Sequence, residues 1–209
     1  MKLQIDIDYK NNVFELPQLT RIIGEPSTAT LIDLRNEIRC NAQSVTTTLG
    51  GGKYGHLGLV MSATAYQALP DTVPYLRPEY LGPFRIEQRN ATETEIAQEK
   101  ADYDESIRLW REVKAVERAL VQQIVAAVEP KYLKALRKQL TTKIMRDVKG
   151  ILSYLFDNYG KVPPAVLKDM KRKVEDYDLD PNDPVDLLFV EIDELSNIYN
   201  LQKNPMTDT

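Results

Sequence analysis

The strongest pattern of apolar and polar positions along the chain predicts one long helix between residues 92 and 128. Thr92 and Glu95 have the spacing of a capping box, which marks a helix start, and Pro130 stops the pattern. The apolar stripe, spaced by three or four residues, consists of Tyr103, Ile107, Trp110, Val113, Val116, Leu120 and Ile124. At ~1.5 Å per residue such a helix is a rod of about 54 Å, long enough to be the spine of a helical bundle.

Shorter segments of the chain also carry helix signals. The expected helices cover residues 27–42, 63–69, 131–139, 148–159, 165–177 and 184–201. Ser62 and Asp147 are the expected N-caps of the second and the fourth, and Gly160 is expected to end the fourth. Four prolines between Pro70 and Pro83 predict an extended connection before the long helix.

The N-terminal segment has a different period. Leu3, Ile5 and Ile7 alternate with polar residues, which is typical of a half-buried strand. Residues 10–12 offer turn chemistry before a second short apolar run, so we expect a β-hairpin over residues 3–16. The fold class expected from the whole pattern is mainly α, with one long central helix and a short N-terminal β-hairpin.

Composition narrows the functions open to this chain. Its 209 residues include one cysteine, Cys40, and one histidine, His56. An internal disulfide, a zinc knuckle and any two-histidine metal site are therefore excluded by count, and we expect no metal and no cofactor. The chain start does not have the pattern of a signal peptide, and no apolar run approaches the ~20 residues that span a membrane. We therefore expect a cytoplasmic protein with no membrane partner.

A glycine-rich stretch is the main candidate for small-molecule chemistry. Residues 50–55 match the pattern G-x-G-x-x-G, but a dinucleotide site needs that pattern between a strand and a helix, and here a helix precedes it. We expect a mobile surface loop instead. His56 is the single candidate imidazole base, and no nucleophile elbow surrounds any serine. We expect no catalytic centre and no small-molecule substrate; an enzyme that uses this loop and His56 is the third alternative.

Charge is unevenly distributed, although the net charge is only −4. Seven basic residues and one acid lie between residues 131 and 149, whereas residues 175–194 contain nine acids and no base. The basic residues are Lys131, Lys134, Arg137, Lys138, Lys143, Arg146 and Lys149. Opposed patches of this kind can bring copies of a protein together, or the basic one can hold phosphates. Two ordinary solvated faces are the simpler alternative.

Several motifs resemble the Gag-like proteins of copia-type LTR retrotransposons, as found in algal genomes. They are TRIIGEP at 20–26, TLGGG at 48–52, GHLGLV at 55–60, AVE at 115–117, QQIVAA at 122–127, YLKALR at 132–137, ILSYLFDNYG at 151–160 and DPNDPV at 180–185. The resemblance covers most of residues 20–208. It implies a helical, capsid-like bundle that assembles with copies of itself into virus-like particles around RNA. The zinc knuckle of many Gag proteins is absent from this sequence.

On this interpretation, residues 1–161 form a capsid-like helical domain, and residues 162–209 form a C-terminal helical segment, an incomplete second lobe. Self-association is expected through Trp110, Val113, Leu120, Leu188, Phe189 and Ile192. RNA is the other expected partner. The alternative is a monomeric nucleic-acid-binding helical module, a degenerate or host-adopted Gag, that uses the basic patch at residues 131–149.

Overall fold

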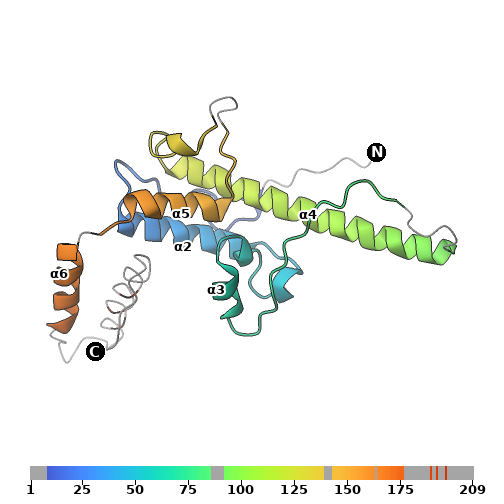
Figure 1. Ribbon diagram of the computed structural model, residues 1–209, viewed down its shortest axis with the longest axis horizontal. Helices are drawn as coiled ribbons and strands as arrows, with labels where there is room; N and C mark the ends of the chain where they lie inside the picture. The colour runs from blue at the N-terminus through green and yellow to red at the C-terminus, as the bar shows by residue number, and fades with distance from the viewer. Residues whose placement is uncertain are drawn as a thin grey trace.

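The computed structural model describes residues 9–85, 92–138, 143–162 and 164–176, together with Phe189, Ile192 and Ser196. The α-helices are α1 (Tyr9–Asn12), α2 (Thr28–Ser44), α3 (Ala63–Gln67), α4 (Glu93–Ala127), α5 (Val148–Tyr159) and α6 (Pro164–Glu175). The 3-10 turns are η1 (Leu49–Gly51), η2 (Leu57–Leu59) and η3 (Lys134–Leu136). The predicted mainly α-helical fold class, with one long helix, is confirmed (Figure 1).

The helices begin at the caps that the sequence predicts. At the start of α4, the Glu95 backbone N–H donates to Thr92 Oγ1 at 3.3 Å, and the Thr92 N–H donates to Glu95 Oε2 at 2.8 Å. Asp147 Oδ1 accepts from the N–H of Gly150 at 2.8 Å and so caps α5. Each cap satisfies N–H groups that the first turn of a helix leaves without a partner.

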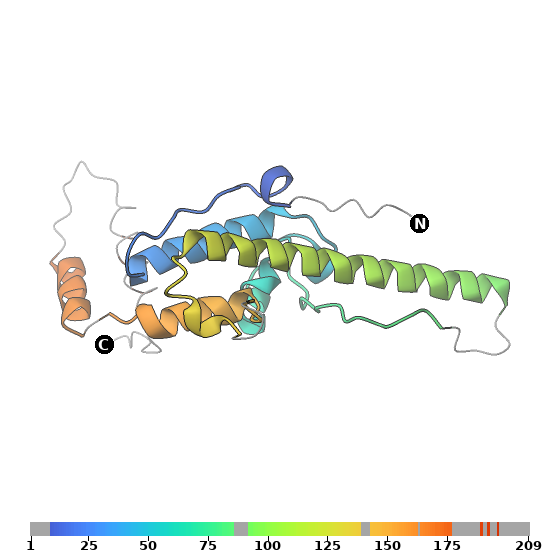
Figure 2. The same ribbon diagram turned by 90° about the horizontal axis from the view of Figure 1, so that it is seen from above.

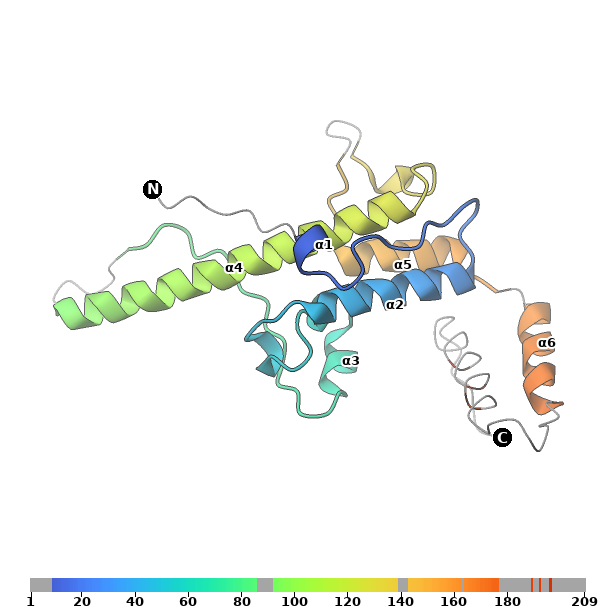
Figure 3. The same cartoon turned by 180° about the vertical axis from the view of Figure 1, so that it is seen from behind.

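The hydrophobic core lies where α2 and α5 pack against the C-terminal half of α4 (Figures 1 and 3). Its most deeply buried side chains are Leu31, Leu34 and Ile38 of α2, Val113, Val116, Leu120 and Ile124 of α4, and Ile151 and Leu155 of α5. Full burial of one such side chain stabilises the fold by about 1.5–3 kcal/mol. This packing fixes the rotation of α4 about its own axis and thereby determines which face of the helix stays exposed.

The N-terminal part of α4 projects beyond this core (Figures 1 and 2). No residue between 92 and 106 is buried, and the first buried residue of the helix is Ile107. We call residues 93–106 the arm. The extended residues 73–85, here called the strap, run along α4 and reach the arm at their C-terminal end: the Tyr103 hydroxyl donates to the Gly82 carbonyl at 2.6 Å, and Phe84 packs on Tyr103 with ring centres 5.3 Å apart.

The predicted N-terminal β-hairpin is not formed where the structure describes it. Residues 1–8 lie outside the described part, but Tyr9–Asn12 is the one-turn helix α1, and residues 13–16 are irregular. The physical reason is an alternative partner for the backbone of Leu16. Its N–H donates to Asn41 Oδ1 at 2.8 Å, and its carbonyl accepts from Asn41 Nδ2 at 2.8 Å. A buried side chain thus replaces the second strand.

The expectation for residues 131–139 also needs correction. The stretch 131–139 was expected as a helix, but its described residues form turns, the short η3, and an antiparallel bridge between Arg137 and Ile144. The Lys138 N–H donates to the Lys143 carbonyl at 3.2 Å, so this backbone folds back on itself instead of continuing as a helix. The glycine-rich stretch lies at the surface from Gly51 to Tyr54, whereas Gly50 and residues 55–60 are buried.

The C-terminal part of the chain is described only in outline. Helix α6 follows α5 and stands apart from the α2–α4–α5 core in Figures 1 and 3. Most of the expected helix at 184–201, including Leu188, lies outside the described residues, as does most of the acidic stretch 175–194. The division at residue 161 stays a prediction. Within the described residues, no helix has both the length and the apolar character needed to cross a membrane.

Candidate nucleic-acid and assembly interface

A basic groove follows the C-terminal half of α4 on the side that α2 and α5 leave open. It consists of two adjoining hollows of about 940 and 490 Å³. Both are lined by Arg118, Val121 and Ile144, so they form one continuous feature. One wall is the exposed face of α4 from Trp110 to Val125, and the other is the fold-back that holds Ile144.

Six cations and two carboxylates line this groove. The cations are Arg77, Lys114, Arg118, Arg137, Lys143 and Arg146, and the carboxylates are Glu117 and Asp147. Glu117 is already engaged by Arg77, and Asp147 caps α5. Among the described residues, no ion pair engages the last four of these cations. The groove therefore holds several positive charges without a local counter-charge.

Three of the seven basic residues predicted from sequence meet in this groove. Arg137, Lys143 and Arg146 line it, because the bridge between Arg137 and Ile144 turns the fold-back toward α4. Lys138 is exposed beside them, bonded through its backbone to Lys143, but it is not among the lining residues. Three of the seven bases that lie close together in the sequence thus also lie close together in the structure.

The other predicted bases lie elsewhere. Lys131 is paired with Glu129 at 3.0 Å, and Lys134 is exposed on η3 without lining the groove. Lys149 lines a separate hollow with Arg35, where burial lowers the pKa of the Lys149 ammonium. The seven residues therefore do not lie on one continuous surface.

Sequence reasoning missed the three cations that come from outside the segment 131–149. Lys114 and Arg118 are four residues apart on one face of α4, a spacing that places them side by side on a helix. That spacing was a usable signal. Arg77 comes from the strap and is placed by its contact with Glu117, and nothing in the local sequence marks that contact.

The arm has the opposite charge. Between residues 93 and 106 there are six acids and one base, Lys100. The acids are Glu93, Glu95, Glu99, Asp102, Asp104 and Glu105. Of these, only Glu105 has an ion-pair partner among the described residues, namely Arg108. One helix thus carries an acidic half and a half that lines a basic groove.

The strap leaves apolar side chains uncovered. Val73, Leu76, Tyr80 and Leu81 are all more than half exposed, with Leu76 at 75 %. Four of the eight large exposed apolar side chains of the described residues therefore fall within nine residues of sequence. Contiguous exposed apolar surface is typical of interaction sites, whereas single exposed side chains are ordinary, so the strap is a candidate for such a surface.

The residues expected to mediate self-association divide into two groups. Val113 and Leu120 are 1 % and 0 % exposed within the chain's own core, so the folded domain has no surface to offer through them. Trp110 is half-buried at one end of the groove, packed on Tyr80 with ring centres 5.0 Å apart. Phe189 is exposed, and Ile192 is half-buried. Of the expected residues, Trp110, Phe189 and Ile192 therefore remain at least partly accessible to a partner.

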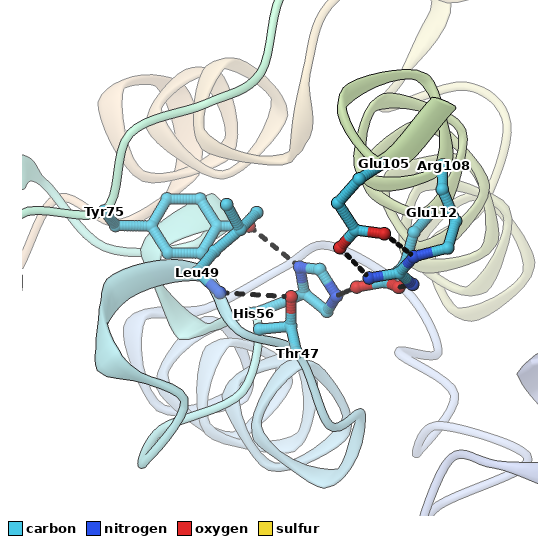
Figure 4. A network of polar contacts seen from close by, with 7 residues as sticks. All are labelled: Thr47, Leu49, His56, Tyr75, Glu105, Arg108 and Glu112. Carbon is cyan, nitrogen blue, oxygen red and sulfur yellow. Dashed lines mark hydrogen bonds and ion pairs between the residues drawn. The ribbon is translucent and has the colours of Figure 1, made fainter. Parts of the chain in front are cut away.

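A buried polar network fixes the strap and the glycine-rich stretch to α4 (Figure 4). His56 Nε2 lies 3.0 Å from Glu112 Oε1, and His56 Nδ1 lies 2.8 Å from the Tyr75 hydroxyl. An ionised Glu112 accepts from Nε2–H, which leaves Nδ1 to accept the Tyr75 O–H. Arg108 then bridges Glu112 and Glu105 at 2.8 and 2.7 Å. The imidazole is 0 % exposed, and its geometry is that of a fully satisfied structural group.

Electrostatics agree with a neutral imidazole. Burial, partly offset by Glu112, lowers the pKa of His56 from its ordinary value of 6.5. Burial also raises the pKa of Tyr75, which stays protonated and keeps its donor. Among the described residues, no group of three or more His, Cys, Asp or Glu side chains is arranged to hold a metal ion.

Close packing explains the glycines next to His56. Gly55 has φ +50°, and a Cβ there would lie 2.5 Å from the carbonyl oxygens of Gln43 and Val45. A Cβ at Gly58 would lie 2.2 Å from the ring of Tyr75. These glycines let the backbone approach α2 and the strap, which is a packing role.

Comparison of the chain with protein-family models, with curated proteins and with solved structures finds no match. The resemblance to Gag-like proteins therefore rests on the sequence motifs, and it stays a prediction.

Proposed function

We propose that this chain is a structural protein that associates with copies of itself, in the manner of the Gag-like capsid proteins that its motifs resemble, and that it has no catalytic role. The observation that carries the proposal is the strap. Its Leu76, Tyr80 and Leu81 are more than half exposed, and the arm that its C-terminal end contacts has no buried residue. The cost of leaving such side chains in water is removed when a partner covers them, at about 25 cal/mol per Å² of apolar surface.

The test is mass by light scattering as a function of protein concentration. We expect the average mass to rise with concentration, and a Leu76→Ser/Leu81→Ser variant to need at least about tenfold more protein for the same mass, which corresponds to ~1.4 kcal/mol. The matched control is Ile23→Ser/Val166→Ser, because both residues are exposed but lie off the strap. A wild-type chain that stays monomeric at every concentration contradicts the proposal.

A second candidate function, RNA binding, is favoured by the basic groove. Arg118, Arg137 and Lys143 line it without carboxylate partners among the described residues, so they are available to phosphates. Three phosphate contacts on a single strand give a slope of about −2 for log affinity against log salt. Fluorescence anisotropy with a single-stranded RNA measures this slope. Arg118→Glu should weaken binding, and Lys134→Glu, which does not line the groove, should have little effect.

A further inference from the structure

We propose that the basic groove receives the acidic arm of a second copy of this chain. This inference rests on the self-association proposed above and adds a charged contact to the apolar one made by the strap. The arm has six acids against one base, and the groove has six cations against two carboxylates. Complementary potentials of this kind orient two proteins as they meet and fix their register.

Local helix chemistry does not account for the charge of the arm. Acids at a helix N-terminus interact favourably with the helix dipole, but this effect fades beyond the first turn. It covers Glu93 and Glu95, the two acids of the first turn. Glu99, Asp102 and Asp104 lie beyond that turn and have no ion-pair partner among the described residues. Asp102 accepts a hydrogen bond from Gln98, but no cation of the described residues lies within ion-pair distance of these three carboxylates.

The two surfaces match in length. At ~1.5 Å per residue, the arm from residue 93 to residue 106 is about 20 Å long. The groove follows α4 from Trp110 to Val125, which is about 22 Å on the same scale. An arm can therefore lie along the groove for most of its length, with its carboxylates near Arg118, Arg137 and Lys143.

The arm cannot fill the groove of its own chain. Both lie on α4, which runs without a break from Glu93 to Ala127 (Figure 2). A continuous helix cannot fold one half back onto the other. Each copy thus offers one arm and one groove to other copies, and the contact either closes as a reciprocal pair or continues from copy to copy.

The experiment reverses charge on each surface separately and then on both. The arm variant is Asp102→Lys/Asp104→Lys, and the groove variant is Arg118→Glu/Lys143→Glu. These positions avoid Glu95, which caps α4, and Glu105, which holds Arg108. We expect each variant alone to need at least about tenfold more protein to associate, or ~1.4 kcal/mol.

Two combinations give the sharpest readout. The variant with both reversals keeps the net charge of −4 and restores complementarity with opposite sign, so we expect it to associate like the wild type. An equimolar mixture of the two single-surface variants pairs reversed arm with reversed groove, and intact arm with intact groove. We therefore expect the mixture to associate like the wild type, although each component alone needs at least about tenfold more protein.

Matched controls place the same charge changes elsewhere. Asp169→Lys/Glu175→Lys reverses two exposed acids on α6, and Lys134→Glu/Lys168→Glu reverses two exposed bases outside the groove. Both should associate like the wild type. Salt gives an independent check: association should weaken between 0.1 and 1 M NaCl, where the screening length falls from about 10 to 3 Å. Circular dichroism confirms that each variant is helical.

The outcomes separate this inference from the proposed function. If the wild type associates but neither reversal changes its mass, the arm-and-groove contact is wrong and self-association through another surface stands. If the groove variant no longer binds single-stranded RNA but associates like the wild type, the groove binds RNA and the inference is overturned. If the wild type is monomeric throughout, both proposals fall.

Discussion

The two halves of α4 differ in what covers them, although they form one helix. The C-terminal half buries seven residues, from Ile107 to Ala127, and is held by α2 and α5. The arm buries none and is held at one end by a capping box and along one side by the strap. A free helix of 14 residues is marginal in water, so the packed half must nucleate the arm. The same helical pattern can thus extend from a packed core helix into a segment that is exposed to solvent.

The largest expected contrast comes from truncating one apolar side chain in each half. Leu120→Ala removes a fully buried side chain, so we expect the free energy of unfolding to fall by about 2–5 kcal/mol. Ile96→Ala, on the half-buried face of the arm, should cost less than about 1 kcal/mol because little apolar surface is lost there. Urea unfolding followed by circular dichroism measures both.

Equal losses in these two variants would contradict the division of α4. They would mean that the arm is packed as tightly as the core in solution.

A smaller contrast is expected for polar side chains. Asn41→Ala leaves the Leu16 N–H and Gln123 Oε1 without their partners in a buried site, so we expect a loss of about 1–3 kcal/mol. Gln98 of the arm donates to Asp102 at 2.8 Å, but both groups are exposed. We expect Gln98→Ala to change the free energy of unfolding by less than about 0.5 kcal/mol. Denaturant titration of both variants decides whether burial sets this difference.

The sequence predicted the regular elements well, because their signals are local. The caps at Thr92 and Asp147 and the stripe of α4 follow from residues within a few turns of one another. The second strand of the predicted hairpin is not formed, because the partner of Leu16 is Asn41, 25 residues away, and such a side-chain contact has no periodic signal in the sequence. The burial of residues 55–60 has no local signal either, since it depends on close contacts of Gly55 with α2 and of Gly58 with the strap.

The candidate site was predicted only in part. Arg137, Lys143 and Arg146 are close in sequence and were found by counting charges. Arg77 could not be found that way, because it reaches the groove through a contact with Glu117 that is 40 residues away. The alternation of Leu3, Ile5 and Ile7 lies outside the described residues and remains a prediction.

The two regions should also titrate in different pH ranges. Burial lowers the pKa of His56 below 6.5, so the unfolded chain binds more protons than the folded one as pH falls through that value. We therefore expect the free energy of unfolding to fall as the pH is lowered from 7.5 to 5.5. Thr92 lowers the pKa of Glu95, whose contribution is lost only as pH falls below 4.5.

His56→Gln tests this assignment. Since His56 is the single histidine, the variant should lose most of the change in stability between pH 7.5 and 5.5, whatever its stability at pH 7.5. An equally steep fall in the variant would show that another group titrates in this range.

The smallest expected effect compares two helix caps of the same kind. Asp147→Ala removes the cap of α5, which is packed in the core, so we expect the whole fold to lose about 1 kcal/mol. Thr92→Ala removes the cap of the arm, where the same ~1 kcal/mol acts on a segment that can fray by itself. Global unfolding should then barely change, while amide hydrogen exchange over the first turns of the arm should speed up about fivefold, as ~1 kcal/mol implies. If Thr92→Ala instead lowered global stability as much as Asp147→Ala, the arm would unfold together with the core, and its role as a separately presented surface would be lost.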